Sequence, residues 1–203
     1  IKGGVGAVEH MKISLSSKDS IVAPITKTTS SLYVADYLDA GITSGWQLVE
    51  IPLVAFANLN AAEKAKSVEL TFVFEYAYAH GSGFATSGSV NIDQIKLTTI
   101  DTNFVRIDSF GDAWGLNALN GNAGNSNPVE APYTLNGPDA LGLTGHSLQW
   151  NYAVNAGLPY IYVFNIIGGG STAWAKKLVD FTAYNKVTLY VKGNTTSGTP
   201  TKI

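Results

Sequence analysis

Short runs of alternating apolar and polar residues are the feature that most constrains this chain. Residues 11–15 and 70–75 place an apolar side chain at every second position. Successive side chains of a β-strand point to opposite faces, so this spacing predicts strands with one buried face. The same pattern predicts further strands over residues 47–51, 90–97, 104–110, 147–154, 160–166 and 186–191.

Turn-rich segments separate these runs. Residues 81–88, 117–127 and 194–200 are dense in Gly, Asn, Ser and Thr, which accept positive φ or bond their own backbone. Helix signals are scarce: residues 60–63 form a capping box, and residues 171–178 predict a second short helix, both as connections between strands. We therefore expect one all-β domain over residues 1–203, an antiparallel β-sandwich of the jelly-roll type.

Composition excludes several classes of protein. The chain is 45% hydrophobic and only 14% charged, which is not the composition of a disordered chain. With 13 Lys and Arg against 15 Asp and Glu, it offers no basic surface for nucleic acid or anionic lipid. The absence of cysteine excludes disulfides and Cys-ligated metals. No apolar run reaches the ~18 residues of a membrane helix, and we expect no membrane span.

The start of the chain lacks the pattern of a signal peptide. It begins at Ile1, without an initiator Met, a basic head or an apolar stretch before a small-residue cleavage site. We therefore expect either a processed start or a piece of a longer protein.

Each half of the chain contains an ordered set of strand-like runs. Residues 45–56, 68–75 and 90–97 resemble, in this order, the closing half of the jelly-roll carbohydrate-binding modules of bacterial polysaccharide-degrading enzymes. Residues 105–112, 117–121, 147–152 and 180–193 resemble the opening half of the same family. The resemblance implies the family fold in circularly permuted order, with residues 1–100 as its closing half and 104–203 as its opening half.

The permuted order leaves two arrangements open. In the first, one chain folds as a permuted jelly roll, with Ile203 close to Ile1. In the second, residues 1–100 complete a sandwich with residues 104–203 of a neighbouring chain, because each half alone leaves strand edges unpaired. Repeated head to tail, the second arrangement makes a filament.

The resemblance also implies a structural Ca²⁺. Asp93 and Asp108 fall in the family's last and first strands, which are neighbours in a jelly roll, and Asp112 is expected to assist. Carboxylate and carbonyl oxygens are the ligands that Ca²⁺ prefers. Residues 109–112 read Ser-Phe-Gly-Asp where the family commonly has Asp-Phe-Glu-Asp, so at least one ligand is missing. The alternative is that these Asp side chains cap turns.

No cluster of residues indicates catalysis. His10, His80 and His146 lie in separate contexts and none has the i,i+4 spacing of a helical metal motif. The carboxylates that glycoside hydrolysis could use are Glu75, Asp93, Asp108 and Glu130. We expect the protein not to be an enzyme, and a glycosidase ranks behind two other functions.

The alternation divides the strand side chains into two sets. The set expected in the core comprises Met11, Ile13, Phe72, Phe74, Leu148, Trp150, Val187, Leu189 and Val191, joined by Trp46 from the resemblance. The opposite set, expected on an outer face, comprises Lys12, Ser14, Thr71, Glu75, Gln149, Asn151, Thr188, Tyr190 and Lys192.

Sugar recognition requires flat aromatic faces and neutral polar groups held on rigid strands. The resemblance implies that the outer face, concave in the family, binds glycan. Tyr190 is expected to be the platform, flanked by Gln149 and Asn151, with Glu75 and Lys192 bonding hydroxyls. Further aromatic contributors are expected at Tyr160, Tyr162, Trp114 and Trp174. The alternative is a hydrated sheet face on which Tyr is frequent because of its β-propensity.

Two functions follow. The first is an extracellular, non-catalytic carbohydrate-binding β-sandwich whose partner is a polysaccharide or glycan. The alternative is a secreted structural subunit that exchanges strands or half-domains with identical subunits and forms a filament, tubule or surface layer.

Overall fold

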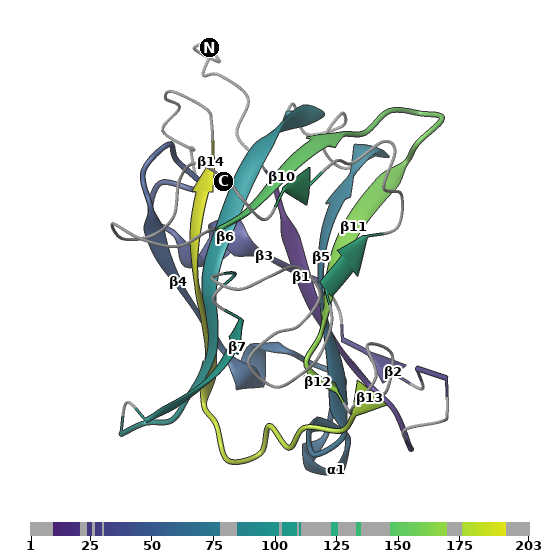
Figure 1. Ribbon diagram of the computed structural model, residues 1–203, viewed down its shortest axis with the longest axis vertical. Helices are drawn as coiled ribbons and strands as arrows, with labels where there is room; N and C mark the ends of the chain where they lie inside the picture. The colour runs from purple at the N-terminus through teal and green to yellow at the C-terminus, as the bar shows by residue number, and fades with distance from the viewer. Residues whose placement is uncertain are drawn as a thin grey trace.

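The protein is an all-β sandwich of two antiparallel sheets packed face to face (Figure 1), which confirms the predicted fold class. The computed structural model describes residues 10–20, 24–25, 27–29, 31–77, 85–101, 103–108, 110, 123–125, 133–134, 147–169 and 176–193. The predicted approach of Ile1 to Ile203 lies outside these residues. None of the helices in the described part is long and apolar enough to cross a membrane.

Sheet A has the strand order β2–β1–β5–β11–β8, and β3 also pairs with β1. Its strands are β1 (Lys12–Ser17), β2 (Lys27–Thr28), β3 (Leu32–Tyr33), β5 (Ser67–Glu75), β8 (Ala123–Asn125) and β11 (Tyr160–Ile166). The long pairings of β5 with β1 and β11 are antiparallel. They make β5 the centre of this sheet.

Sheet B has the strand order β4–β14–β6–β10–β9, and β7 also pairs with β6. Its strands are β4 (Gln47–Pro52), β6 (Ser87–Thr98), β7 (Phe104–Asp108), β9 (Tyr133–Thr134), β10 (Leu148–Ala153) and β14 (Lys186–Gly193). Residues 87–92 of β6 pair with β10, and residues 95–98 of β6 pair with β7. Strands β10 and β7 therefore follow one another along the same side of β6.

Each sheet contains strands from both halves of the chain. In sheet B the late strand β14 lies between the early strands β4 and β6, as the colours of Figure 1 show. In sheet A the late strand β11 pairs with the early strand β5. In both sheets, strands of one half of the chain therefore pair directly with strands of the other half.

Between the sheets lies one continuous apolar core. All nine strand residues expected to face inward are buried, from Met11 to Val191, with at most 2% of the surface of each exposed. Burying one such side chain contributes about 1.5–3 kcal/mol. Trp46, which was expected in the core, is only half-buried, because it precedes β4 instead of lying within the strand.

A bulge at Gln94 decides which side chains of β6 face outward. Gln94 has a φ of 53°, and the pairing of β6 with β14 shifts register between Thr188 and Tyr190. An extra residue reverses the alternation of a strand. Ile92 before the bulge and Ile95 after it therefore both face the core.

Short helices connect strands and do not form a layer. The capping box is confirmed: Asn60 Oδ1 accepts the Glu63 N–H at 3.0 Å and Glu63 Oε2 accepts the Asn60 N–H at 2.7 Å, which starts α1 (Ala61–Lys64). The 3₁₀ helices η1 (Val34–Tyr37) and η2 (Leu53–Ala55) follow β3 and β4. Figure 1 shows α1 at the lower end of the sandwich.

The second predicted helix, residues 171–178, is wrong where the structure describes it. Lys176 and Lys177 form strand β13 (Lys176–Lys177), which pairs antiparallel with β12 (Gly168–Gly169). Pairing with a distant segment overrides the weak local helix signal. Residues 171–175 lie outside the described part.

Candidate functional site

The predicted glycan-binding residues lie on two opposite faces of the sandwich. Tyr190 and Lys192 on β14 and Gln149 and Asn151 on β10 face outward from sheet B. Glu75 on β5 and Tyr162 on β11 face outward from sheet A. Glu75 therefore cannot assist Tyr190, and the expected single surface is corrected to two. Trp174 and Trp114 lie outside the described residues.

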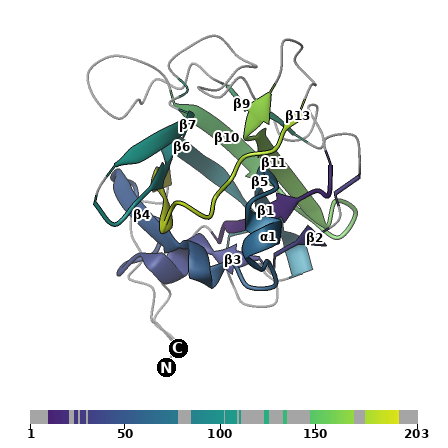
Figure 2. The same cartoon turned by 90° about the horizontal axis from the view of Figure 1, so that it is seen from below.

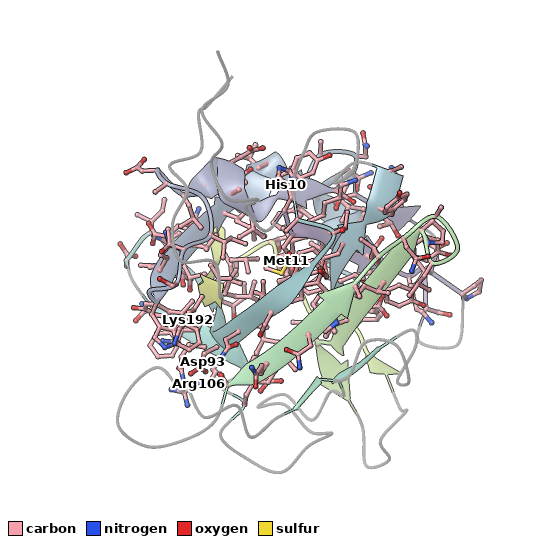
Figure 3. The ribbon with its side chains drawn as sticks, turned by 90° about the horizontal axis from the view of Figure 1, so that it is seen from above. His10, Met11, Asp93, Arg106 and Lys192 are labelled. Carbon is pink, nitrogen blue, oxygen red and sulfur yellow. The ribbon has the colours of Figure 1, made fainter. Side chains whose placement is uncertain are left out.

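The sheet B face is mainly polar. Lys192 is opposite Asn91 on β6, and Asn91 is opposite Gln149 on β10. Two residues before Lys192 on β14, Tyr190 lies between Leu48 on β4 and Asp93 on β6. Asn91 and Asp93 are only 6% and 2% exposed, whereas Leu48 is 46% exposed. Tyr190 therefore lies between an exposed leucine and a largely buried carboxylate. Figure 3 shows Lys192 and Asp93 on the same side of the view, away from His10.

The sheet A face gathers aromatic rings. We call the set Tyr33, Lys12, Glu75, Tyr160 and Tyr162 the tyrosine face. Tyr33 on β3 is opposite Lys12 on β1, which is opposite Val73 on β5, and Val73 is opposite Tyr162 on β11. Tyr160 is opposite Glu75. The pairing of four strands therefore brings these side chains, far apart in sequence, onto one surface.

An ion pair lies within the tyrosine face. Lys12 Nζ bonds Glu75 Oε2, and it also lies 5.2 Å from the centroid of the Tyr33 ring. The two side chains are 15% and 41% exposed. The rings of Tyr160 and Tyr162 are nearly parallel, with centroids 6.4 Å apart and planes 17° apart. Flat rings thus adjoin a neutralised pair of charges that still donates and accepts hydrogen bonds.

His10 borders this face and is uncharged at neutral pH. Its ring meets the edge of Tyr33, with centroids 4.1 Å apart. Burial disfavours the imidazolium, and the nearby Lys12 charge repels it, so the pKa of His10 falls to about 4. Lys12 and Glu75 therefore carry the charge next to the Tyr33 ring, and His10 adds an apolar edge.

Tyr33 is the residue of this face that the sequence does not predict. Its strand has only two residues, Leu32 and Tyr33, and alternation cannot be recognised in so short a run. Lys12, Glu75, Tyr160 and Tyr162 all belong to runs of five or more residues that predict strands. No local signal in residues 31–34 indicates that Tyr33 joins them.

The predicted calcium ligands lie on neighbouring strands. Asp93 on β6 and Asp108 on β7 are 2% and 7% exposed, and the two strands pair directly. Asp93 Oδ1 accepts the Gln94 N–H at 2.6 Å, and Asp108 Oδ1 accepts the Phe110 N–H at 2.8 Å. Asp112 lies outside the described part, within which no group of three His, Asp or Glu is placed to hold a metal ion.

Among the described carboxylates considered for hydrolysis, Glu75 lies apart from Asp93 and Asp108. Glu75 is on sheet A, whereas Asp93 and Asp108 are on sheet B, so the core separates them. Glu130 lies outside the described residues.

A pocket of about 360 Å³ opens between α1, η2 and residues 181–185, and its ionisable side chains are Lys64 and Tyr184. Lys64 Nζ donates to the Leu53 carbonyl oxygen at 2.9 Å.

Comparison with models of protein families, with curated proteins and with solved structures finds no match to this chain. The resemblance to carbohydrate-binding modules therefore rests on the runs quoted above, and any function has to be argued from the surfaces themselves.

Proposed function

We propose that this chain is an extracellular, non-catalytic carbohydrate-binding module that binds glycan through the tyrosine face. The observation that carries the proposal is the nearly parallel pair of rings, Tyr160 and Tyr162, beside the ion pair of Lys12 and Glu75. Aromatic faces match the apolar side of a sugar ring, and polar groups at their margin match its hydroxyls. Tyr160 is 55% exposed and available for such contact.

Each group has a role in this mechanism. The rings of Tyr160 and Tyr162 stack against sugar rings, while Lys12 donates to hydroxyls and Glu75 accepts from them. The neighbouring inward residues, Ile161 and Phe74, are buried in the core, which fixes both strands before a ligand arrives. A fixed platform loses little conformational entropy on binding.

The sheet B face supports binding less well. It presents Tyr190 without a second described tyrosine, and Gln149 Nε2 already donates to Ser89 Oγ at 3.3 Å. The other exposed aromatic ring on this sheet, Phe104, belongs to the edge strand β7 and has Lys96 Nζ 4.6 Å from its centroid, whereas the tyrosine face offers two consecutive tyrosine rings. We therefore assign the platform to Tyr160 and Tyr162 in place of Tyr190.

The experiment is a glycan array followed by calorimetry on the glycan bound best by the wild type. Tyr160→Ala and Tyr162→Ala should each weaken binding about tenfold or more, which corresponds to about 1.4 kcal/mol. Tyr190→Ala is the matched control, since it removes an outward tyrosine from the opposite sheet, and it should change the affinity less than about twofold.

The outcomes separate the site from the function. If the wild type binds nothing on the array, carbohydrate binding is overturned. If Tyr190→Ala abolishes binding and Tyr160→Ala does not, the function stands and the assignment of the site is wrong.

A second candidate function, a secreted structural subunit that assembles with identical copies, is favoured by one observation. In the described part of the chain, the two unpaired edge strands of sheet B carry exposed charges of opposite sign, Glu50 on β4 and Arg106 on β7. Assembly through these edges leaves the tyrosine face free, because that face belongs to sheet A.

A further inference from the structure

Among the residues that the structure describes, sheet B has an unpaired strand edge on each side. Within the described part of the chain, β4 pairs only with β14, and at the other side β7 pairs only with β6. Figure 2 shows β4 and β7 on the two sides of this sheet. The outer backbone groups of such strands are ready to pair with another strand.

The hydrogen-bond ladders identify the outward groups. The Thr99 N–H donates to the Asn103 carbonyl oxygen at 2.8 Å, so in the alternating ladder the N–H and C=O of Phe104 and Arg106 point to the open edge. The Leu53 N–H donates to the Asn185 carbonyl oxygen at 2.7 Å. By the same alternation, Glu50 on β4 points its backbone groups outward.

Pro52, like Glu50, directs its backbone away from β14 and toward the unpaired edge of β4. A proline lacks a backbone N–H, so it leaves no donor unsatisfied on an open edge, which is where proline is tolerated in a sheet. Its carbonyl oxygen remains available as an acceptor. The lower part of β4 therefore offers two acceptors and one donor to an incoming strand.

Strand directions permit these two edges to meet. Each of β4, β14, β6 and β7 is antiparallel to the next, so β7 runs opposite to β4. When a second copy is placed beside the first in the same orientation, its β4 is antiparallel to β7 of the first. The contact joins two different surfaces and repeats from copy to copy, as in a head-to-tail filament.

Charge fixes the register. Arg106 is exposed on β7, and the Glu50 side chain on β4 is 49% exposed. Both project from the outer face of sheet B, because their neighbours Ile107 and Ile51 are buried. Opposite charges directly across two strands stabilise the pairing, and like charges destabilise it. Pairing β7 with β7 across Arg106, or β4 with β4 across Glu50, places like charges opposite each other, so the pairing of β7 with β4 is favoured.

Exposed apolar side chains lie at the same end of both edges. Phe104 on β7 is 52% exposed, and Ile100 in the β6–β7 turn is 81% exposed. Val54, which follows β4, is 83% exposed. With Arg106 opposite Glu50, Phe104 lies opposite Pro52, and Val54 lies toward the turn that carries Ile100. Apolar surface that is wet on a single copy is then covered.

We propose that identical copies of this chain join edge to edge, with β7 of one copy paired to β4 of the next, and extend sheet B into a filament. The register sets Arg106 opposite Glu50 and Phe104 opposite Pro52. This assembly does not depend on glycan binding.

Two charge-reversal variants test the contact, because each should abolish assembly alone and a mixture of the two should restore it. Sedimentation velocity and negative-stain electron microscopy of the wild type should show polymers that lengthen with concentration. Arg106→Glu alone and Glu50→Arg alone should each remain monomeric, because like charges then meet at every contact. An equal mixture of the two variants should polymerise again, since each contact in an alternating filament joins one Glu to one Arg.

The controls separate assembly from folding. Glu50 also pairs with Lys186, so the melting curve of each variant is measured, and the recovery of polymers on mixing shows that both variants remain folded. Asp19→Arg changes an exposed charge between β1 and β2 and should leave the polymers intact. A wild type that stays monomeric at every concentration overturns the proposal, as do polymers that Arg106→Glu does not shorten.

Discussion

The ring of Tyr152 lies flat against the ring of Phe74, with centroids 3.6 Å apart and planes 6° apart. Tyr152 belongs to β10 of sheet B and Phe74 to β5 of sheet A, so this pair joins the two layers. Both residues are 2% exposed. Trp150 also packs against Phe74, with ring centroids 4.9 Å apart and planes tilted by 59°.

A double-mutant cycle should detect this contact. Phe74→Leu and Tyr152→Leu should each lower the free energy of unfolding, and the coupling between them should be about 0.5–1.5 kcal/mol. Urea denaturation of the wild type, the two single variants and the double variant measures it. Phe74→Leu combined with Val54→Ala is the control, because Val54 is 83% exposed and its effect should add within about 0.5 kcal/mol. A coupling near zero for the ring pair contradicts the prediction.

Gly88→Ala should destabilise the sandwich by about 1–3 kcal/mol, because the added methyl group has no space beside the Tyr152 ring. Gly88 is directly opposite Tyr152, and a Cβ at Gly88 would lie 2.9 Å from the Tyr152 hydroxyl oxygen. The tyrosine ring must then move off Phe74. Gly45→Ala is the matched control, since the nearest atom to its Cβ is 4.0 Å away. Equal melting temperatures for the two variants would show that the ring has room to move.

His10 should make the protein less stable in mild acid. Its pKa is about 4 in the folded protein and 6.5 when unperturbed, so the unfolded chain takes up a proton at a higher pH than the folded chain does. The free energy of unfolding is therefore unaffected by His10 above about pH 6.5, falls as the pH drops toward 4, and changes no further below that.

The variant His10→Asn tests this dependence. Urea denaturation at pH 7.5 and pH 5 should show a smaller loss of stability in the variant than in the wild type. The carboxylates also contribute at lower pH: the bond from Lys27 lowers the pKa of Glu63, and the Thr182 hydroxyl lowers the pKa of Asp180. Both are unchanged in the variant, so the difference between the two proteins reports on His10. Parallel curves would refute the prediction.

Chelation tests the predicted calcium ion. An ion that binds the folded protein and not the unfolded chain raises the melting temperature. EDTA should therefore lower the melting temperature, and added Ca²⁺ should restore it. Asp93→Asn and Asp108→Asn should each remove this response, because both carboxylates come from the paired strands β6 and β7. Asp19→Asn, at an exposed bend, should keep it. If EDTA leaves the wild-type melting curve unchanged, the prediction of a bound calcium ion is wrong.

The long strands could be predicted because alternation marks which face is buried. The run at residues 186–191 becomes β14, and Val187, Leu189 and Val191 all face the core. Strands β2, β3, β9 and β13 have two residues each, and such short strands exist only because a distant strand pairs with them. No local pattern distinguishes them from loops or single helical turns, and the sequence of residues 171–178 therefore predicts a helix where Lys176 and Lys177 form a strand.

The candidate site could be predicted only in part, for a related reason. Alternation correctly placed Glu75 and Tyr190 outside the core, but it does not say to which sheet a strand belongs. That choice depends on pairings between residues more than sixty positions apart, such as Lys12 with Val73. The outward residues were therefore identified one by one, whereas their grouping into two faces was not.

The position of β14 has a consequence for how the molecule is made. It is the last strand of the described chain, yet it lies between β4 and β6 and pairs with both. During synthesis, β4 and β6 are finished first and wait with facing edges exposed until residues 186–193 emerge. Folding dominated by such distant pairings is slow and passes through states that are prone to aggregate. A ribosome-bound chain that stops before residue 186 should therefore recruit chaperones, and release of the full chain should end that dependence.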